Sequence, residues 1–427
     1  MSAEFRNSSG YPALCFEHVN HHGERRTVVV ARVTLKFDHD GAVSPCDPQP
    51  PLNFKEVPFE QVGRGPAECA LHRESDLAPE KPLVDVVVQG TAYAPSERGA
   101  RRFQVRLEIE EPIQGRAFGA ASAAAFQAAG NWSLDVYGSS EWRWRHPLGR
   151  FWRGLVCAVT LGLLRPSPWR RSWTVPVAAV PLRYSCARGG RLELRDGERS
   201  FVFCNEENPS GTGWLPSIAA IRAQTGLSWF GAWRQRGRLA SQNPVVSAAQ
   251  IWPAGAARPH RPDGDGDVGG WGAIAKPWLP RRRHAGTYDD AWQDGRRPLL
   301  PHDFDPRYWN GAHPDLQLSA LSPDARLRLV GLLPPTVRAD RTFQIDLPGL
   351  RFAACIHEAG KPEQSRELRL DTVLLDAEAR EVALLYRINL PLAGGVVALR
   401  RSDLQLAASH AFHHAPDAHL PSKERIA

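Results

Sequence analysis

Lysine and methionine are scarce in this chain, which has six lysines and one methionine among 427 residues. Arginine therefore supplies nearly all of the positive charge, and the formal net charge of +7 is modest for this length. A nucleic-acid-binding protein usually concentrates much more basic charge in one patch. We therefore expect no nucleic acid among the partners, although an acidic protein partner is compatible with this charge.

Paired cysteines and long apolar runs are also missing. The seven cysteines are an odd number and none forms a C-x-x-C pair, which argues against a disulfide framework and a zinc ribbon. The N-terminus, MSAEFRNSSG, lacks the basic start and apolar core of a signal peptide. The most apolar run, residues 155–164, is too short to span a bilayer. These absences predict a cytoplasmic protein without membrane insertion.

Glycine, proline and alternating apolar residues are abundant. The chain has 36 glycines and 36 prolines, and apolar residues alternate with polar ones in residues 31–37 and 103–109. This period of two is typical of half-buried strands. We predict a mainly β, multi-lobed protein built from antiparallel sheets or sandwiches, with a few short helices. Helical patterns occur at residues 120–130, 215–226 and 322–331.

The composition changes along the chain and indicates four parts. We predict an N-terminal β-rich domain (residues 1–204), a loop-rich central region (205–320), a C-terminal β-rich part (321–408) and a flexible tail (409–427). The central region is rich in Trp, Pro and Gly. Irregular regions of this length are usually functional or disordered, and the repeated tryptophans argue against disorder. Residues 257–270 lack such anchors and are expected to form a mobile insertion.

Aspartates and histidines are concentrated in residues 286–315. One interpretation is a metal-dependent hydrolase that uses His302, Asp303, Asp305 and His313 as ligands or as acid and base. The other is structural, because acids and histidines beside prolines commonly cap turns and bond to backbone amides. We favour the structural interpretation, in which Asp289, Asp303 and Asp305 brace the loop.

Other signals of chemistry are weak. No G-x-S-x-G nucleophile motif occurs, and the acidic run 263–267 lacks the glutamate that closes an EF-hand. The turn NPSGTGW, with Asn208, Gly211 and Gly213, lacks the Lys-Ser/Thr of a P-loop, so its glycines are expected to provide positive φ angles. We predict no cofactor, no metal and no catalytic residue.

Tryptophan and arginine alternate in residues 141–155 and 167–173. Arginine packed on indole rings inside the protein explains this pattern most simply. A protein-binding surface ranks second, since both residue types favour interfaces, and nucleic acid ranks third. The possible partner contacts in the chain are Trp142, Trp144, Trp152, Trp278 and Arg281.

Several stretches occur in an order that resembles a known bacterial family. They include KPLVDVVVQGTAYAP (from Lys81), NPSGTGW, KPWLPRRRHAGTYDDAW (from Lys276), PLLPHDFDPRYWNGAHPDLQ and LRLDTVLLDAEAREVALLYR. Together they resemble the family called domain of unknown function 2169, which is found in type VI secretion gene clusters. The motif positions are Asn208, Gly211, Gly213, Gly286, Thr287, Tyr288, Asp289, Trp292, Asp303, Phe304 and Asp305.

The resemblance implies a role without catalysis. Members are thought to act as adaptors or chaperones that load a toxic effector onto the secretion spike. The implied partners are proteins, namely the secreted effector and the spike trimer or its cap protein. The resemblance attaches no catalytic residues to the family, so it adds none to this chain.

Overall fold

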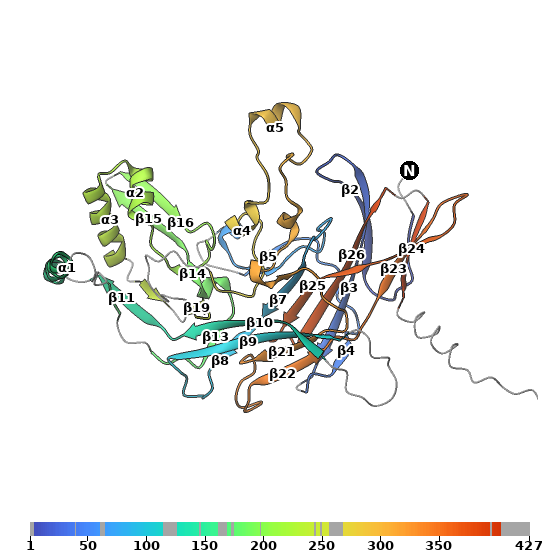
Figure 1. Ribbon diagram of the computed structural model, residues 1–427, viewed down its shortest axis with the longest axis horizontal. Helices are drawn as coiled ribbons and strands as arrows, with labels where there is room; N and C mark the ends of the chain where they lie inside the picture. Colours follow the sequence, from blue (N-terminus) through green and yellow to red (C-terminus); the bar gives the residue numbers. More distant parts are fainter. Residues whose placement is uncertain are drawn as a thin grey trace, which may run out of the picture.

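The protein is mainly β-sheet, as the alternating pattern predicted. In the computed structural model, most sheets form one large body, and a smaller lobe carrying α1, α2 and α3 lies at one end (Figure 1). The structure describes residues 4–38, 40–59, 65–113, 126–144, 147–160, 169–171, 175–196, 198–242, 245–247, 250–255, 268–392 and 395–402.

A seven-stranded sheet forms the centre of the body. Its longest strand, β3 (Arg25–Phe37), is buried on both faces because apolar β-branched residues occupy most of its middle. The other strands, in spatial order with β4 attached to β3, are β2 (Ala13–Val19), β26 (Glu381–Pro391), β25 (Arg369–Asp376), β7 (Val84–Gln89), β20 (Gln317–Leu318) and β4 (Val43–Pro45).

A five-stranded sheet packs against the seven-stranded sheet. In β9 (Arg102–Pro112) the apolar side chains alternate with exposed ones, so one face is buried, as the sequence predicted. The stacked rings of Phe37 and Phe343, 5.3 Å apart, join the two sheets within one core. The remaining strands are β19 (Gln250–Pro253), β10 (Phe126–Tyr137), β21 (Arg326–Val330) and β22 (Thr342–Asp346).

Smaller sheets complete the described body. A four-stranded sheet contains β1 (Glu4–Asn7), β27 (Val396–Arg401), β23 (Phe352–His357) and β24 (Gln364–Glu367). Three strand pairs are β5 (Val57–Pro58) with β6 (Leu71–Arg73), β8 (Thr91–Tyr93) with β13 (Ala179–Pro181), and β14 (Arg188–Gly189) with β17 (Thr212–Gly213).

The helical lobe has a small core of its own. Helix α2 (Ile218–Thr225) starts at Ser217, whose hydroxyl accepts from Ala220 N at 3.0 Å, and ends at Gly226 with a φ of +71°. This confirms the helix predicted at residues 215–226. The lobe also contains α1 (Pro147–Val159), α3 (Trp229–Gln242), β11 (Ser140–Trp144), β12 (Trp169–Arg171), β15 (Arg191–Asp196), β16 (Arg199–Cys204) and β18 (Val245–Ser247).

Two of the three helix predictions were wrong. Residues 126–130 belong to strand β10, and residues 114–125 lie outside the described part. Residues 326–330 form strand β21, in which Leu327 and Leu329 enter the core while Arg328 is exposed. The residues before this strand are typical of a helix start, but pairing with β9 and β22 stabilises a strand instead. The sheets are also not wholly antiparallel, since β1–β27, β7–β25 and β14–β17 run parallel.

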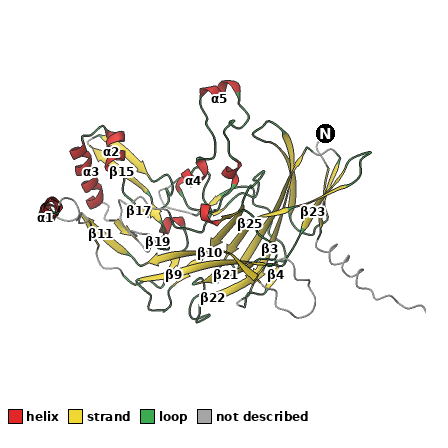
Figure 2. Ribbon diagram, in the orientation of Figure 1, coloured by secondary structure: helices red, strands yellow, loops and turns green. Residues whose placement is uncertain are grey.

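The predicted boundaries at residues 204 and 320 do not separate one sheet from another. The seven-stranded sheet takes strands from the predicted N-terminal, central and C-terminal parts alike. Besides the predicted α2, the central region contains α3 and the short helices α4 (Leu279–Arg282) and α5 (Asp290–Gly295), as Figure 2 shows. Most of the predicted insertion at residues 257–270, and the tail at 409–427, lie outside the described residues.

Candidate functional site

The most specific stretch of the sequence forms an arm, residues 284–305, that projects from the body with α5 at its tip (Figure 1). Asp289 caps α5 by accepting from Trp292 N at 2.9 Å. The Trp292 indole donates to Leu299 O at 2.9 Å, and Tyr288 packs edge-on against it with ring centroids 4.7 Å apart. These bonds close the tip on itself, so these motif residues hold the shape of the arm.

Asp303 closes the neck of the arm. Its carboxylate accepts from Thr287 N at 2.9 Å and from Thr287 Oγ1 at 2.7 Å, and these bonds lower the pKa of Asp303. Gly286 passes so close that a Cβ there would lie 2.9 Å from Asp303 Oδ1, and its φ is +81°. Only glycine meets both requirements without strain.

Asp305 and Phe304 fasten the base of the arm. Asp305 caps a 3-10 helix, η3 (Pro306–Trp309), by accepting from Arg307 N at 2.9 Å, and lies 3.0 Å from His284 Nδ1. Burial raises the pKa of Asp305, but its bonds to Arg307 and His284 outweigh burial and lower it to about 2. Phe304 is buried and contacts the rings of Tyr308 and Trp309. Both residues therefore brace the loop.

The two histidines of the alternative metal site point to other partners. His302 is exposed and lies 3.4 Å from Arg296 Nη1. His313 Nε2 lies 2.9 Å from Val268 O. In the part of the chain that the structure describes, no three His, Cys, Asp or Glu side chains gather closely enough to hold a metal ion. The acidic run 263–267 lies outside that part.

The Asn208 turn is also an interior brace. Asn208 is fully buried and its Nδ2 donates to Tyr184 O at 2.8 Å and to Arg188 O at 3.0 Å. Gly213 has the predicted positive φ, at +79°. Gly211 does not: it is needed because a Cβ there would lie 2.6 Å from Asn208 Nδ2. The prediction of positive φ was therefore wrong at Gly211, where crowding is the cause.

Trp278 and Arg281 are interior residues, which corrects the prediction that they contact a partner. Each is 1% exposed. The Trp278 indole donates to Ala67 O at 2.8 Å and packs edge-on against Tyr184. Arg281 donates to Ile274 O at 2.9 Å and Tyr308 O at 3.0 Å, and pairs with Glu74 at 2.7 Å. Both side chains therefore join loops inside the protein.

Arg281 belongs to an interior charge network that the sequence did not reveal. Lys81 Nζ lies 3.1 Å from Glu74, 2.7 Å from Asp85 and 3.1 Å from the Thr372 hydroxyl. Burial raises the pKa of Glu74, but Arg281 and Lys81 overcome this effect and lower it to about 2. The network comprises Arg32, Glu74, Asp76, Lys81, Asp85, Arg281, Asp371 and Arg387.

The rest of the network joins strands of the central sheet to each other and to the segment before β7. Arg387 Nε lies 2.8 Å from Asp371 Oδ2, and Arg32 lies 2.9 Å from Asp76. Burial raises the pKa of Asp371 even though Arg387 counteracts it. The cavity beside these groups measures about 20 Å³, room for about one water molecule. A substrate does not fit there, so the network stabilises the fold.

Lys81, Arg281 and Arg387 come from three of the stretches that carry the family resemblance, and the fold brings them together. Residues 22–387 match the model of a protein family described as an uncharacterized protein conserved in bacteria (DUF2169). The chain belongs to the DUF2169 family. No curated protein and no solved structure matches it.

Apolar side chains of this DUF2169 chain reach solvent on the helical lobe. On α1, Phe151 is 70%, Trp152 65% and Val159 75% exposed, and Leu155 lies between them at helical spacing. On α3, Trp229 and Phe230 are exposed. Trp142 and Trp144 lie in β11, but their side chains are outside the description. None of the described helices combines the length and apolarity needed to cross a bilayer.

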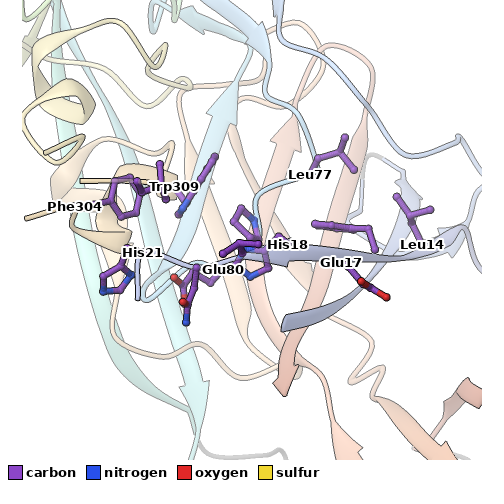
Figure 3. Close-up of a pocket in the computed structure, with 13 residues that line it drawn as sticks. Leu14, Glu17, His18, His21, Leu77, Glu80, Phe304 and Trp309 are labelled. Atoms are coloured by element: carbon purple, nitrogen blue, oxygen red, sulfur yellow. The ribbon is translucent and has the colours of Figure 1, made fainter. Parts of the chain in front are cut away.

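A pocket of about 510 Å³ opens at the other end of this DUF2169 chain, beside β2. It lies between β2, the segment 77–80 and the base of the arm, and much of its lining is apolar (Figure 3). A mostly apolar cavity of this size is typical of a binding site. The sequence prediction missed it because its three walls come from distant parts of the chain.

Proposed function

We propose that this DUF2169 protein is a non-enzymatic adaptor that binds a type VI secretion effector and helps to load it onto the spike or its cap. The observation that carries this proposal is a pair of separate apolar surfaces. One is the exposed face of α1, and the other is the pocket beside β2; the two elements lie at opposite ends of the molecule (Figure 1). An adaptor needs two such surfaces because it holds two partners at once.

The chemistry of the surfaces supports protein partners. Phe151, Leu155 and Val159 follow one face of α1 at helical spacing, and this face and the adjacent Trp152 are open to solvent. Exposed clusters of this kind mark interaction sites, and buried tryptophan dominates many interfaces. The motif carboxylates of the arm, in contrast, bond to their own loop, so they favour a framework role over a reaction.

Purification of the tagged protein from its native host tests the proposal. We expect an effector and a spike component to co-purify with the wild-type protein. The double variant Phe151→Ala/Trp152→Ala should lose one of the two partners by about tenfold or more while keeping the other, because truncated hot-spot residues cost at least about 2 kcal/mol. The matched control is Phe54→Ala, which removes an exposed ring elsewhere.

Two outcomes would count against the adaptor. The first is a wild-type preparation that carries no secretion component. The second is tightly held divalent metal in a one-to-one ratio, which would favour the hydrolase interpretation. Metal analysis of the same preparation therefore separates the two interpretations.

A further inference from the structure

The pocket beside β2 is lined by apolar side chains together with a few polar ones. Its apolar lining includes Leu14, Phe16, Leu77, Phe304 and Trp309. Figure 3 shows Leu14 and Leu77 towards one end and His21, Phe304 and Trp309 towards the other, with His18 and Glu80 between them. The pocket is therefore elongated along β2, as an extended peptide requires.

Strand β2 is an edge of the seven-stranded sheet. In the described part of the chain it pairs only with β3. Arg32 N donates to Pro12 O, and Asn20 N donates to Glu24 O, which fixes the alternation of the antiparallel ladder. Even-numbered residues of β2 therefore point their backbone groups at β3, and odd-numbered residues such as Cys15, Glu17 and Val19 point theirs outwards.

The side chains of β2 alternate between the two faces of the strand. Ala13 and Cys15 pack against the hydrophobic core, whereas Leu14, Phe16 and His18 line the pocket. A strand added along the outer edge of β2 would thus bond to the outward backbone groups and place alternate side chains in the pocket. This combination is how sheet edges bind extended peptides.

The cations beside the pocket are already engaged, since Arg25 pairs with Glu17 and Arg296 donates to the backbone oxygens of His21 and Leu300. Glu80 lines the pocket and is half-buried, and among the described residues no hydrogen bond or ion pair engages its carboxylate. Glu17 bonds to Arg25 through Oε2, but its Oε1 is buried without a hydrogen-bond partner. Burial lowers the pKa of His18 and of His21, so both are largely neutral at pH 7 and do not balance Glu80.

We propose that this groove binds an extended, apolar segment of the effector that carries a lysine or arginine and adds as a strand to β2. The apolar side chains enter between Phe16, Leu77 and Trp309, and the cation meets Glu80. This inference rests on the proposed adaptor function and names the part of the adaptor that holds the effector.

Photocrosslinking in the native host tests the groove directly. The photoreactive amino acid benzoylphenylalanine is placed at Leu77, and for comparison at Val202, an exposed position on the helical lobe. We expect crosslinks from Leu77 to one effector segment that is apolar, extended and contains Lys or Arg, and none from Val202. A crosslink to a second copy of this chain, or to an acidic or helical segment, would overturn the inference.

Substitutions test the Glu80 charge and the outer backbone edge of β2 separately. Glu80→Lys should reduce effector capture by about tenfold, as expected for reversing a charge in an interface, and Glu80→Gln by less. Val19→Pro removes an outward N–H without removing a bond to β3, so it should weaken capture, whereas Val19→Thr should not. Circular dichroism and Tm confirm that each variant is folded.

The results also distinguish this inference from the adaptor function. If the effector still co-purifies with Glu80→Lys and Val19→Pro at the wild-type level, the groove is not its site and the adaptor proposal stands. If the variants lose the effector but keep the spike component, both proposals are supported. If the wild-type protein captures no effector, both are overturned.

Discussion

The central loops and the helical lobe use the same residue types in different surroundings. Trp278 and Arg281 lie inside the loops, where the Trp278 indole N–H and the Nε and Nη1 of Arg281 meet backbone carbonyls or a carboxylate. Trp152 and Trp229 lie on the lobe with more than half of their surface in solvent. The first pair therefore contributes to folding, whereas the second is free to contribute to binding.

The difference shows why residue type alone does not identify a contact surface. The loops provide backbone carbonyls that are not used by helices or strands, and buried Trp and Arg satisfy them. A short helix such as α1 satisfies its own backbone, so its aromatic side chains have no such task. Where tryptophan lies on a regular element and remains exposed, binding is the better explanation.

Replacing one tryptophan in each region tests this contrast, and it should give the largest change in the free energy of unfolding. Trp278→Ala should lower the free energy of unfolding by about 5 kcal/mol, because it leaves a cavity and an unpaired carbonyl. Trp152→Ala should change it by less than about 0.5 kcal/mol, as expected for a surface substitution. Urea denaturation measures both. Equal effects would mean that the two regions do not differ as described.

Lysine offers a second matched pair. Lys81→Met leaves Asp85 buried without its cation and leaves Glu74 with Arg281 alone, so we expect a loss of about 4 kcal/mol in unfolding free energy. Lys361 pairs with Glu358 at the surface, with 64% of its side chain exposed, and Lys361→Met should cost less than about 1 kcal/mol. A stable Lys81→Met protein would show that the network is not needed for folding.

Local features of the sequence were predictable, and long-range ones were not. Asp289 caps the helix that begins at the next residue, and the alternation of β9 follows from one buried face. Glu74 meets Lys81 and Arg281 only because the fold joins distant segments, so no pattern near Glu74 reveals the network. The pocket was missed for the same reason, since β2 and Trp309 become neighbours only in the folded chain.

The mistaken helix at residues 322–331 shows how tertiary pairing overrides local signals. Ser322 does accept a bond from Asp324 N at 3.3 Å, as a helix-starting residue would. Leu327 and Leu329 nevertheless alternate with arginines, and both are buried between β9 and β22. A period of two in the five residues of β21 was the better guide than the cap.

Acid should weaken the buried network through Glu74. Its pKa is lowered to about 2 in the folded protein from an ordinary 4.5, so its stabilisation is present above pH 4.5 and is lost as the pH falls through about 2. Glu74→Gln should therefore be about 3 kcal/mol less stable than wild type at pH 7 and similar to it near pH 2. Urea denaturation across this range measures the difference.

An exposed acid serves as the control for this pH dependence. Glu367→Gln removes a surface carboxylate that lies 3.5 Å from Arg351. Its stability relative to wild type should stay nearly constant from pH 7 to pH 2. If the Glu74→Gln difference were equally constant, the carboxylate of Glu74 would not be the group that the network stabilises.

The neck of the arm gives the smallest expected effect and bears on the framework role. Asp303→Ala removes both bonds to Thr287, so the arm should open more often while the body remains folded. We expect little change in Tm but severalfold faster tryptic cleavage after Arg296, which normally bonds to His21 O and to Leu300 O. Asp294→Ala, an exposed substitution in the same arm that removes no such bond, is the control.

Because Arg296 also steadies the hairpin beside the pocket, an opened arm should weaken effector capture as well. Unchanged capture would show that the arm and the groove act independently.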